Sequence, residues 1–446
     1  MFSLVSYLVP LLLFCGPPDT AKHQAGKTRI ASDDDARKAA TAFVNHLTAG
    51  RYKDAAQLND ATMAKAMPAK KLKDAWLQLT EANGAFKSLG EPTTFRQAGY
   101  LVCAFPATFE HAGLRIQVSV DAAGHIAGLY FRPAADKAVG QLPSYLKTRV
   151  KDRDITVGEG QWALPGTLTL PEMAAPKAAV VFVHGSGPND RDETIGPNKP
   201  FRDLALGLAS HGIASLRYDK RSRVHGKEMI GKSLTVKEEV IDDALTALKL
   251  LRDQSETKDV PIFLLGHSLG AVLAPEIATA DAHLSGVILL AAAARPFPDI
   301  IVDQYTYLCS LSPGKESAAE LAKITRQARA LRERTLAADE KVINADRTYW
   351  YDLCDRDSKT MLKTAAALTC PILVLQGGRD YQATKEDLDL FKKALAEHPR
   401  AKCKLFADLN HLFAAGEGKA TPMEYNDEKH VAPKVIDLIA DWCLKP

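Results

Sequence analysis

Ser268, at the centre of Gly266-His-Ser-Leu-Gly270, is the residue whose surroundings most clearly predict chemistry. The apolar run Val260-Pro-Ile-Phe-Leu-Leu265 precedes this pentapeptide, and the small-residue stretch Ala271–Ala278 follows it. This order predicts a buried strand, a sharp turn and a helix, a setting that exposes a nucleophilic serine hydroxyl. The backbone N–H of Leu269 would then face an oxyanion formed beside that hydroxyl.

A serine nucleophile needs a base within hydrogen-bond reach, and the base needs an orienting carboxylate. His411 follows the predicted strand Lys402–Phe406 by a short loop, from which an imidazole can reach Ser268. Asp380 ends the segment Cys370-Pro-Ile-Leu-Val-Leu-Gln-Gly-Gly-Arg-Asp380, a strand that runs into a glycine turn. The order serine, acid, histidine is that of α/β-hydrolase triads. We therefore predict that Ser268 is the nucleophile, His411 the base and Asp380 the orienting acid.

A second oxyanion donor is expected in the loop His184-Gly-Ser-Gly-Pro-Asn-Asp-Arg-Asp192, which follows the predicted strand Ala178–Val183. We predict that the backbone N–H of Ser186 donates, with that of Gly187 as the next choice. Ser186 is not expected to be a nucleophile, because no strand-to-helix turn surrounds it.

Four side chains are candidate substrate contacts because they border this site: His184, Arg191, Asp192 and His267. The alternative for Arg191 and Asp192 is an ion pair that locks their loop. The sequence holds no H-E-x-x-H, no C-x-x-C, no other metal-ligand spacing and no glycine-rich phosphate loop. We therefore predict neither a metal nor a cofactor.

The elements that must position these residues alternate between strands and helices after Ile155. The strands are continuously apolar, which is typical of a parallel sheet covered on both faces, so we predict an α/β domain over residues 155–446. Strands are predicted at Ala178–Val183, Ile213–Tyr218, Val260–Leu265, Gly286–Leu290, Ile372–Gln376 and Lys402–Phe406, and helices at Phe201–Ser210, Val236–Asp253, Ala271–Ala280 and Lys385–Ala396.

One insertion, residues 296–368, interrupts this alternation. It is charged, helix-prone (Glu316–Ala338 especially) and lacks a predicted strand. We predict a helical cap over the carboxyl ends of the strands. The alternative is a surface helical pair that does not contact substrate.

The first third of the chain predicts a small α+β domain over residues 36–133. It offers no catalytic constellation, and residues 134–154, with their prolines and charges, are predicted to be a linker. Helices are predicted at Ala36–Ala49 and Leu72–Ala82, and strands at Tyr100–Phe109, Leu114–Val120 and Ile126–Phe131.

Residues 1–18 form an apolar candidate signal or lipoprotein segment, followed by a leader, residues 19–35, expected to be flexible. The run is too short to span a bilayer as a helix. We expect export to the periplasm or the medium, with a membrane tether if Cys15 is lipidated. The alternative is a cytoplasmic protein with an apolar N-terminus. Cys309 and Cys354 could pair if the protein is exported.

The composition limits the partners of this chain. Its 446 residues predict two or three domains, and its hydrophobic content of 46% is ordinary for a soluble protein. The 57 basic and 54 acidic residues give a net charge of +3, which argues against nucleic acid as a partner. A small molecule is the expected partner, and a homodimer is left open.

Four segments resemble the bacterial α/β-hydrolase carboxylesterases similar to EstD: His184–Gly196, Arg217-Tyr-Asp-Lys-Arg221, Gly266–Gly270 and Gln376-Gly-Gly-Arg-Asp380. The resemblance covers roughly residues 155–446. It implies an eight-stranded sheet, a helical cap and hydrolysis of short-acyl esters, with Ser268, Asp380 and His411 on the triad positions. The sequence departs from relatives that carry an acidic residue after the serine, because Leu269 stands there.

The first third resembles a domain of unknown function that precedes such hydrolases, with an α+β fold like that of nuclear-transport-factor-2 proteins. That resemblance implies no activity.

The predicted function is a serine carboxylesterase that works through an acyl-enzyme and takes a small-molecule ester. One alternative is a serine aminopeptidase, amidase or thioesterase on the same triad. Another is an exported binding protein whose hydrolase domain is inert. An aminopeptidase needs carboxylates for a free amine, and the insertion offers Asp299, Asp303, Asp352, Asp355 and Asp357.

Overall fold

The computed structural model describes residues 33–97, 100–110, 113–133, 143, 146, 150–229, 232, 235–343, 345–356 and 358–445. Within them the chain forms two compact units, an N-terminal one up to residue 133 and a C-terminal one from residue 150. The candidate signal segment and Cys15 lie outside the described residues. None of the described helices combines the length and apolar character needed to cross a bilayer.

The N-terminal unit packs helices on an antiparallel sheet. Strand order is β1-β3-β4-β5, with β2 also paired to β3. Phe43 and Leu47 of the first helix are fully buried in one cluster with Ile116 and Val118, alternate residues of β4. The elements are α1 (Asp33–Thr48), α2 (Tyr52–Gln57), α3 (Ala61–Ala66), α4 (Ala69–Asn83), β1 (Phe86–Leu89), β2 (Thr93–Gln97), β3 (Tyr100–Phe109), β4 (Gly113–Val120) and β5 (Ile126–Pro133).

The predicted α+β domain is therefore confirmed, although α2, α3, β1 and β2 were not predicted. The expected leader, residues 19–35, overlaps α1, which begins at Asp33. The comparison with nuclear-transport-factor-2 proteins stays a prediction.

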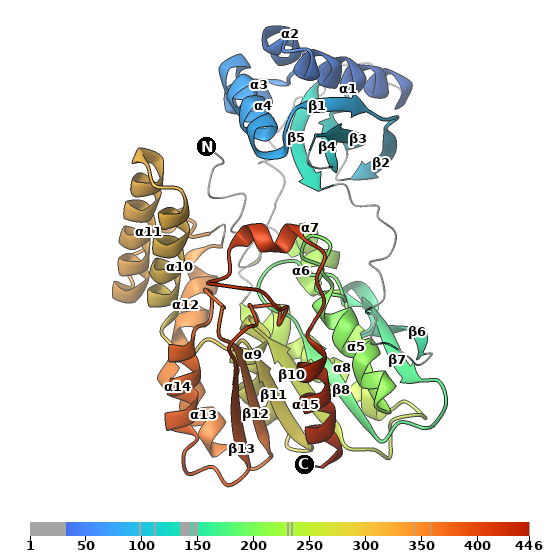
Figure 1. Cartoon of the computed structure of the whole chain (residues 1–446), viewed down its shortest axis with the longest axis vertical. Coiled ribbons are helices and arrows are strands. Elements are labelled where there is room, and N and C mark those ends of the chain that lie inside the picture. The colour runs from blue at the N-terminus through green and yellow to red at the C-terminus, as the bar shows by residue number, and fades with distance from the viewer. Residues whose placement is uncertain are drawn as a thin grey trace. The chain divides into compact units, whose positions relative to one another are not determined.

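The C-terminal unit is built on an eight-stranded sheet in the order β13-β12-β11-β10-β8-β9-β7-β6 (Figure 1). Strands β8 to β13 run parallel, and β6 and β7 add an antiparallel edge. The strands are β6 (Val150–Val157), β7 (Leu164–Pro171), β8 (Ala178–Val183), β9 (Ile213–Tyr218), β10 (Ile262–His267), β11 (Gly286–Leu290), β12 (Ile372–Gly377) and β13 (Ala401–Phe406).

The prediction of a linker over residues 134–154 was wrong at its C-terminal end. Strand β6 occupies Val150–Val157 and contains Lys151-Asp-Arg-Asp154. An edge strand can expose one face to water, so its sequence need not be apolar, and the charged residues of β6 do not predict a strand.

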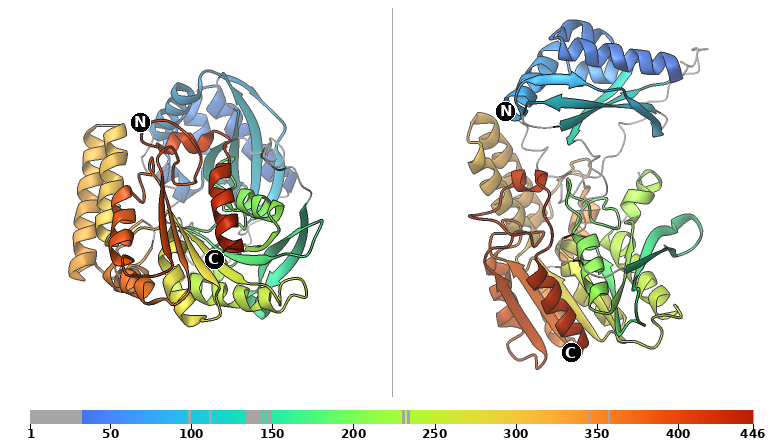
Figure 2. Two further views of the ribbon diagram at one scale, coloured as in Figure 1. Left: turned by 60° about the horizontal axis from the view of Figure 1, so that its bottom comes forward. Right: turned by 45° about the vertical axis from the view of Figure 1, so that its right-hand side comes forward.

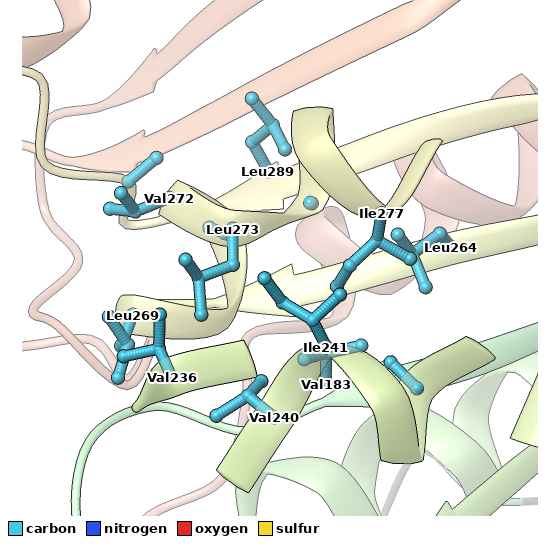
Figure 3. Close-up of a cluster of buried hydrophobic side chains, with 14 of the residues drawn as sticks. Val183, Val236, Val240, Ile241, Leu264, Leu269, Val272, Leu273, Ile277 and Leu289 are labelled. Carbon is cyan, nitrogen blue, oxygen red and sulfur yellow. The ribbon is translucent and has the colours of Figure 1, made fainter. Parts of the chain in front are cut away.

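Helices cover both faces of the sheet, as the apolar strands predict. On β8, Val180 and Phe182 join the cluster of α5 and α15, whereas Val181 and Val183 join that of α8 and α9. Figure 3 shows Val183 packed with residues of α9 and of the helical turn before α8. The helices are α5 (Pro200–Ser210), α6 (Arg221–Val224), α7 (Gly226–Met229), η3 (Lys237–Ile241), α8 (Asp242–Arg252), α9 (Leu269–Ala280), α14 (Lys385–Ala394) and α15 (Pro433–Leu444), with short turns η2 (Gly160–Trp162) and η4 (Pro422–Asn426).

The insertion, residues 296–368, is helical and contributes no strand to the sheet in its described part. Figure 2 shows its first two helices side by side. Cys309 and Cys354, which could pair if the protein is exported, are free thiols on different helices in this structure. The helices are α10 (Phe297–Leu311), α11 (Lys315–Glu333), α12 (Arg347–Asp355) and α13 (Ser358–Ala367).

The first helix of the insertion contacts two loops beyond the sheet. Gln304 Nε2 donates to the carbonyl of Gln382 at 3.1 Å, and Tyr307 Oη donates to that of Ala420 at 3.0 Å. These loops follow β12 and β13, the strands that precede Asp380 and His411. The insertion thus packs on the loops that carry the predicted acid and base.

Candidate active site

Ser268 occupies a strained turn between β10 and α9. Its backbone has φ 53° and ψ −118°, a conformation that costs a non-glycine residue roughly 1–3 kcal/mol. The flanking glycines are required by close approach. A Cβ on Gly266 would lie 2.3 Å from the Gly270 carbonyl oxygen, and one on Gly270 would lie 2.2 Å from that of Val183. Leu269 begins α9, so its N–H has no partner within the helix.

His411 and Asp380 meet at the ends of adjacent parallel strands. His411 Nδ1 donates to Asp380 Oδ2 at 2.7 Å, and both side chains are almost fully buried. The carboxylate is held from its other side, because Oδ1 accepts the backbone N–H of Gln382 at 2.7 Å and Oδ2 accepts Gln376 Nε2 at 3.1 Å. Asp408, nearer to His411 in sequence, is half-exposed and pairs with Lys434.

The loop of His411 is bonded to the residue before the serine. His267 Nε2 donates to the His411 carbonyl at 2.9 Å, and the two rings lie 4.8 Å apart between centroids. Among the described residues, the Ser268 hydroxyl has no hydrogen-bond partner, so the serine–histidine bond is not formed here. Such bonds are often long without substrate and tighten when it binds.

His267 is buried and has protein partners, and its predicted contact with substrate stays a prediction. Its Nδ1 lies 2.9 Å from Glu193 Oε2, although the N–H does not point along a hydrogen bond to that oxygen. Burial disfavours the imidazolium, but the Glu193 carboxylate outweighs this effect and raises the pKa of His267. Burial likewise raises the pKa of Glu193, but His267 reverses that shift and lowers it.

The loop after β8 lies directly beside the serine. A Cβ on Gly185 would lie 3.1 Å from Ser268 Cβ. Ser186 and Gly187, the predicted oxyanion donors, follow in this loop, and Gly187 has φ 93°, which favours glycine. The Gly185 N–H donates to Glu193 Oε1 at 2.7 Å, so the same glutamate holds both this loop and His267.

The other predicted substrate contacts also have protein partners. Arg191 pairs with Asp219 at 3.1 Å, and Asp192 pairs with Arg217 and Lys199, so their charges lock the loop to neighbouring strands. His184 is buried, and its Nε2 donates to the Asp190 carbonyl at 3.1 Å. Burial lowers the pKa of His184 to about 4, which keeps the ring neutral.

Four of the five aspartates that could bind a free amine have ion-pair partners. Asp299 pairs with Arg332, Asp303 with Arg295, Asp352 with Arg356 and Asp355 with Arg334. Asp357 lies outside the described residues. No group of three or more metal-ligating side chains occurs in the described part of the chain.

Comparison with known proteins decides the family. A protein-family model described as serine aminopeptidase S33 matches residues 174–416. The chain belongs to this hydrolase family. The hydrolase is 40% identical to esterase EstD of Thermotoga maritima over 405 residues, which cover 90% of this chain and 94% of the relative. A model for a domain of unknown function, DUF3887, matches residues 40–129. The predicted resemblance and the α/β-hydrolase fold are confirmed, and the protein is an enzyme.

Two solved structures are similar to the hydrolase. An esterase from Pyrococcus furiosus has a TM-score of 0.40 at 17% identity, covering 60% of this chain and 85% of that one. Est1E from Butyrivibrio proteoclasticus has a TM-score of 0.40 at 13% identity, with coverages of 66% and 96%.

Sequence reasoning missed Glu193, Gln376 and the Lys220 side chain as parts of this site. Each is polar and buried; Glu193 and Lys220 contact residues distant in sequence, whereas Gln376 contacts the nearby Asp380. The only signal was their place in the motifs that carry the family resemblance.

Proposed function

We propose that this hydrolase is a serine carboxylesterase that cleaves short-acyl esters through an acyl-enzyme. The observation that carries the proposal is the 2.7 Å bond between His411 Nδ1 and Asp380 Oδ2, on a loop bonded to the residue before Ser268. The name of the relative EstD supports an ester as the substrate.

In the proposed reaction, Ser268 Oγ attacks the ester carbonyl carbon while His411 Nε2 takes the hydroxyl proton. The tetrahedral oxyanion is held by the N–H groups of Leu269 and Ser186. When the intermediate collapses, the C–O bond to the alcohol breaks and His411 returns the proton to the leaving oxygen. His411 then deprotonates a water, which attacks the acyl carbon and releases the acid from Ser268.

The surroundings of Asp380 fit its proposed role. Burial would make a carboxylate costly, but two backbone N–H groups and the Gln376 amide satisfy its oxygens. The bond to Nδ1 fixes the tautomer of His411 that leaves Nε2 free as a base. The carboxylate also stabilises the imidazolium that forms when His411 accepts the proton.

The test is hydrolysis of p-nitrophenyl acetate and butyrate by the full chain and by Ser268→Ala. We expect the variant to keep its thermal unfolding profile and to lose essentially all turnover. Labelling by a fluorophosphonate probe should disappear in the same variant. Full activity of Ser268→Ala would reject the assignment, and Ser186→Ala serves as the control serine in the same site.

A serine aminopeptidase or amidase is the second candidate, since the matching family model is described by that activity. The paired aspartates of the insertion argue against it, because binding a free amine would require breaking an ion pair. Aminoacyl-anilides assayed beside the short esters separate the two: faster turnover of the anilides would favour the peptidase.

A further inference from the structure

Lys220 is a buried cation that the proposed chemistry does not use. It follows β9, its side chain is 2% exposed, and its Nζ donates to the Gly185 carbonyl at 3.0 Å. Its carboxylate partner, Glu239 Oε1, lies 3.3 Å away. A fully buried lysine is rare and costly unless it is paired, so this position calls for an explanation.

Lys220 contacts the Gly185 carbonyl, and the same peptide unit carries the Ser186 N–H. Because a peptide unit is planar, fixing the Gly185 oxygen also fixes the direction of that N–H. An ammonium on the oxygen polarises the unit and makes the opposite N–H a stronger donor. The charge of Lys220 therefore acts on the proposed oxyanion donor without touching substrate.

Other contacts hold the same peptide units. Asn189 Nδ2 donates to the Gly185 carbonyl at 3.2 Å and to the Ser186 carbonyl at 3.1 Å. The Ser186 carbonyl belongs to the unit that carries the Gly187 N–H, the other candidate donor. The backbone N–H of Lys220 donates to the Asn189 carbonyl at 3.0 Å, so the two supports are joined.

The counter-ion of Lys220 leads to the insertion. Glu239 lies in η3, and its Oε2 accepts the Tyr349 hydroxyl at 2.9 Å. Tyr349 belongs to α12 and is also buried. The chain of contacts therefore runs from a helix of the insertion, through Glu239 and Lys220, to the loop beside Ser268.

We propose that Lys220 is a positioning residue that orients and polarises the Gly185–Ser186 peptide as the oxyanion donor, with Glu239 and Tyr349 holding its ammonium in place. This inference rests on the proposed serine hydrolysis. Within the motif Arg217-Tyr-Asp-Lys-Arg221, it gives Lys220 alone a role in transition-state stabilisation.

The test replaces the buried pair together, Lys220→Met with Glu239→Gln, so that no unpaired charge is left inside the protein. Loss of an oxyanion donor costs roughly 100- to 1,000-fold in kcat, and weakening one should cost about 10- to 100-fold. We expect kcat for p-nitrophenyl butyrate to fall in that range while KM stays within about twofold. Affinity for a trifluoromethyl ketone, whose adduct places an oxyanion in the hole, should fall by a similar factor.

The matched control removes the adjacent ion pair, Arg221→Met with Asp243→Asn, which does not contact the loop. Its kcat and its affinity for the ketone should match those of the unmodified enzyme. A folded Lys220→Met/Glu239→Gln variant with unchanged kcat and ketone affinity would overturn the proposal. So would a fall in kcat without a matching loss of ketone affinity, because that indicates a merely structural role.

If the double variant does not fold, Asn189→Ala provides a second test. It removes the side-chain donor to the Gly185 and Ser186 carbonyls and leaves no buried charge. Its kcat and ketone affinity should fall together, and unchanged values would overturn the inference. Failure of the proposed function looks different. In that case the unmodified enzyme would not be labelled at Ser268 by a fluorophosphonate probe, and both proposals would fall.

Discussion

The ionisable side chains buried around Ser268 each have a specific partner, and their protonation states follow from those partners. His267 faces Glu193, which favours its imidazolium. His184 faces a backbone carbonyl and aromatic rings, so burial dominates and keeps it neutral. Two histidines of one site are thereby assigned opposite charge preferences by their surroundings.

The neutral His184 predicts acid sensitivity. Its pKa is lowered from 6.5 to about 4, so the unfolded chain binds its proton first as the pH falls between these values. The free energy of unfolding should therefore drop by about 3 kcal/mol across this range from His184 alone. Urea unfolding at pH 7 and pH 4.5 should show a smaller drop for His184→Gln. An identical pH dependence in the variant would contradict the assignment.

Asp380→Asn tests the orienting carboxylate. Asparagine has the same shape as aspartate, but it favours the other tautomer of His411 and lacks the charge that stabilises the imidazolium. We therefore expect kcat to fall roughly 1,000- to 10,000-fold. The control is Asp408→Asn, which changes a half-exposed carboxylate near the same loop and should keep kcat. Equal activities of the two variants toward p-nitrophenyl butyrate would contradict the role of Asp380 in the reaction.

At the scale of elements, the site depends on a strand, turn and helix packed against β8. Gly270 has no space for a side chain, since a Cβ would lie 2.2 Å from the Val183 carbonyl oxygen. Gly270→Ala should therefore lower the free energy of unfolding by about 1–3 kcal/mol or more. Gly226→Ala, where no atom lies within 4 Å of the added Cβ, should change it little. Similar melting temperatures for both variants would contradict this packing.

The sequence predicted six of the eight strands of the large sheet, among them the edge strand β13, and missed the antiparallel pair β6 and β7. Strands such as Gly286–Leu290 are uniformly apolar, and their observed bounds match the prediction. The edge strand β6 was missed because its sequence is mostly charged and polar. The roles of Glu193 and Lys220 could not be predicted, because each depends on a partner that only folding brings near.

At the scale of the whole molecule, the N-terminal and C-terminal units have separate hydrophobic cores. Phe43→Ala should lower the free energy of unfolding of the N-terminal unit by about 3–5 kcal/mol, because this side chain is fully buried in its core. Calorimetry should show that the melting temperature of one transition falls while that of the other is unchanged. Below the unchanged transition, a fluorophosphonate probe should still label Ser268. A single transition that shifts as a whole would show that the units unfold together.

Direct observation of the acyl-enzyme tests whether Ser268 is the nucleophile. The enzyme is mixed with p-nitrophenyl butyrate, quenched in acid within the first turnovers and digested, and its peptides are weighed by mass spectrometry. We expect a butyryl group on Ser268, and it should accumulate further in Asp380→Asn if that variant slows deacylation more than acylation. A butyryl group on Ser186 or any other residue, or turnover with no acylated peptide, would contradict this role of Ser268.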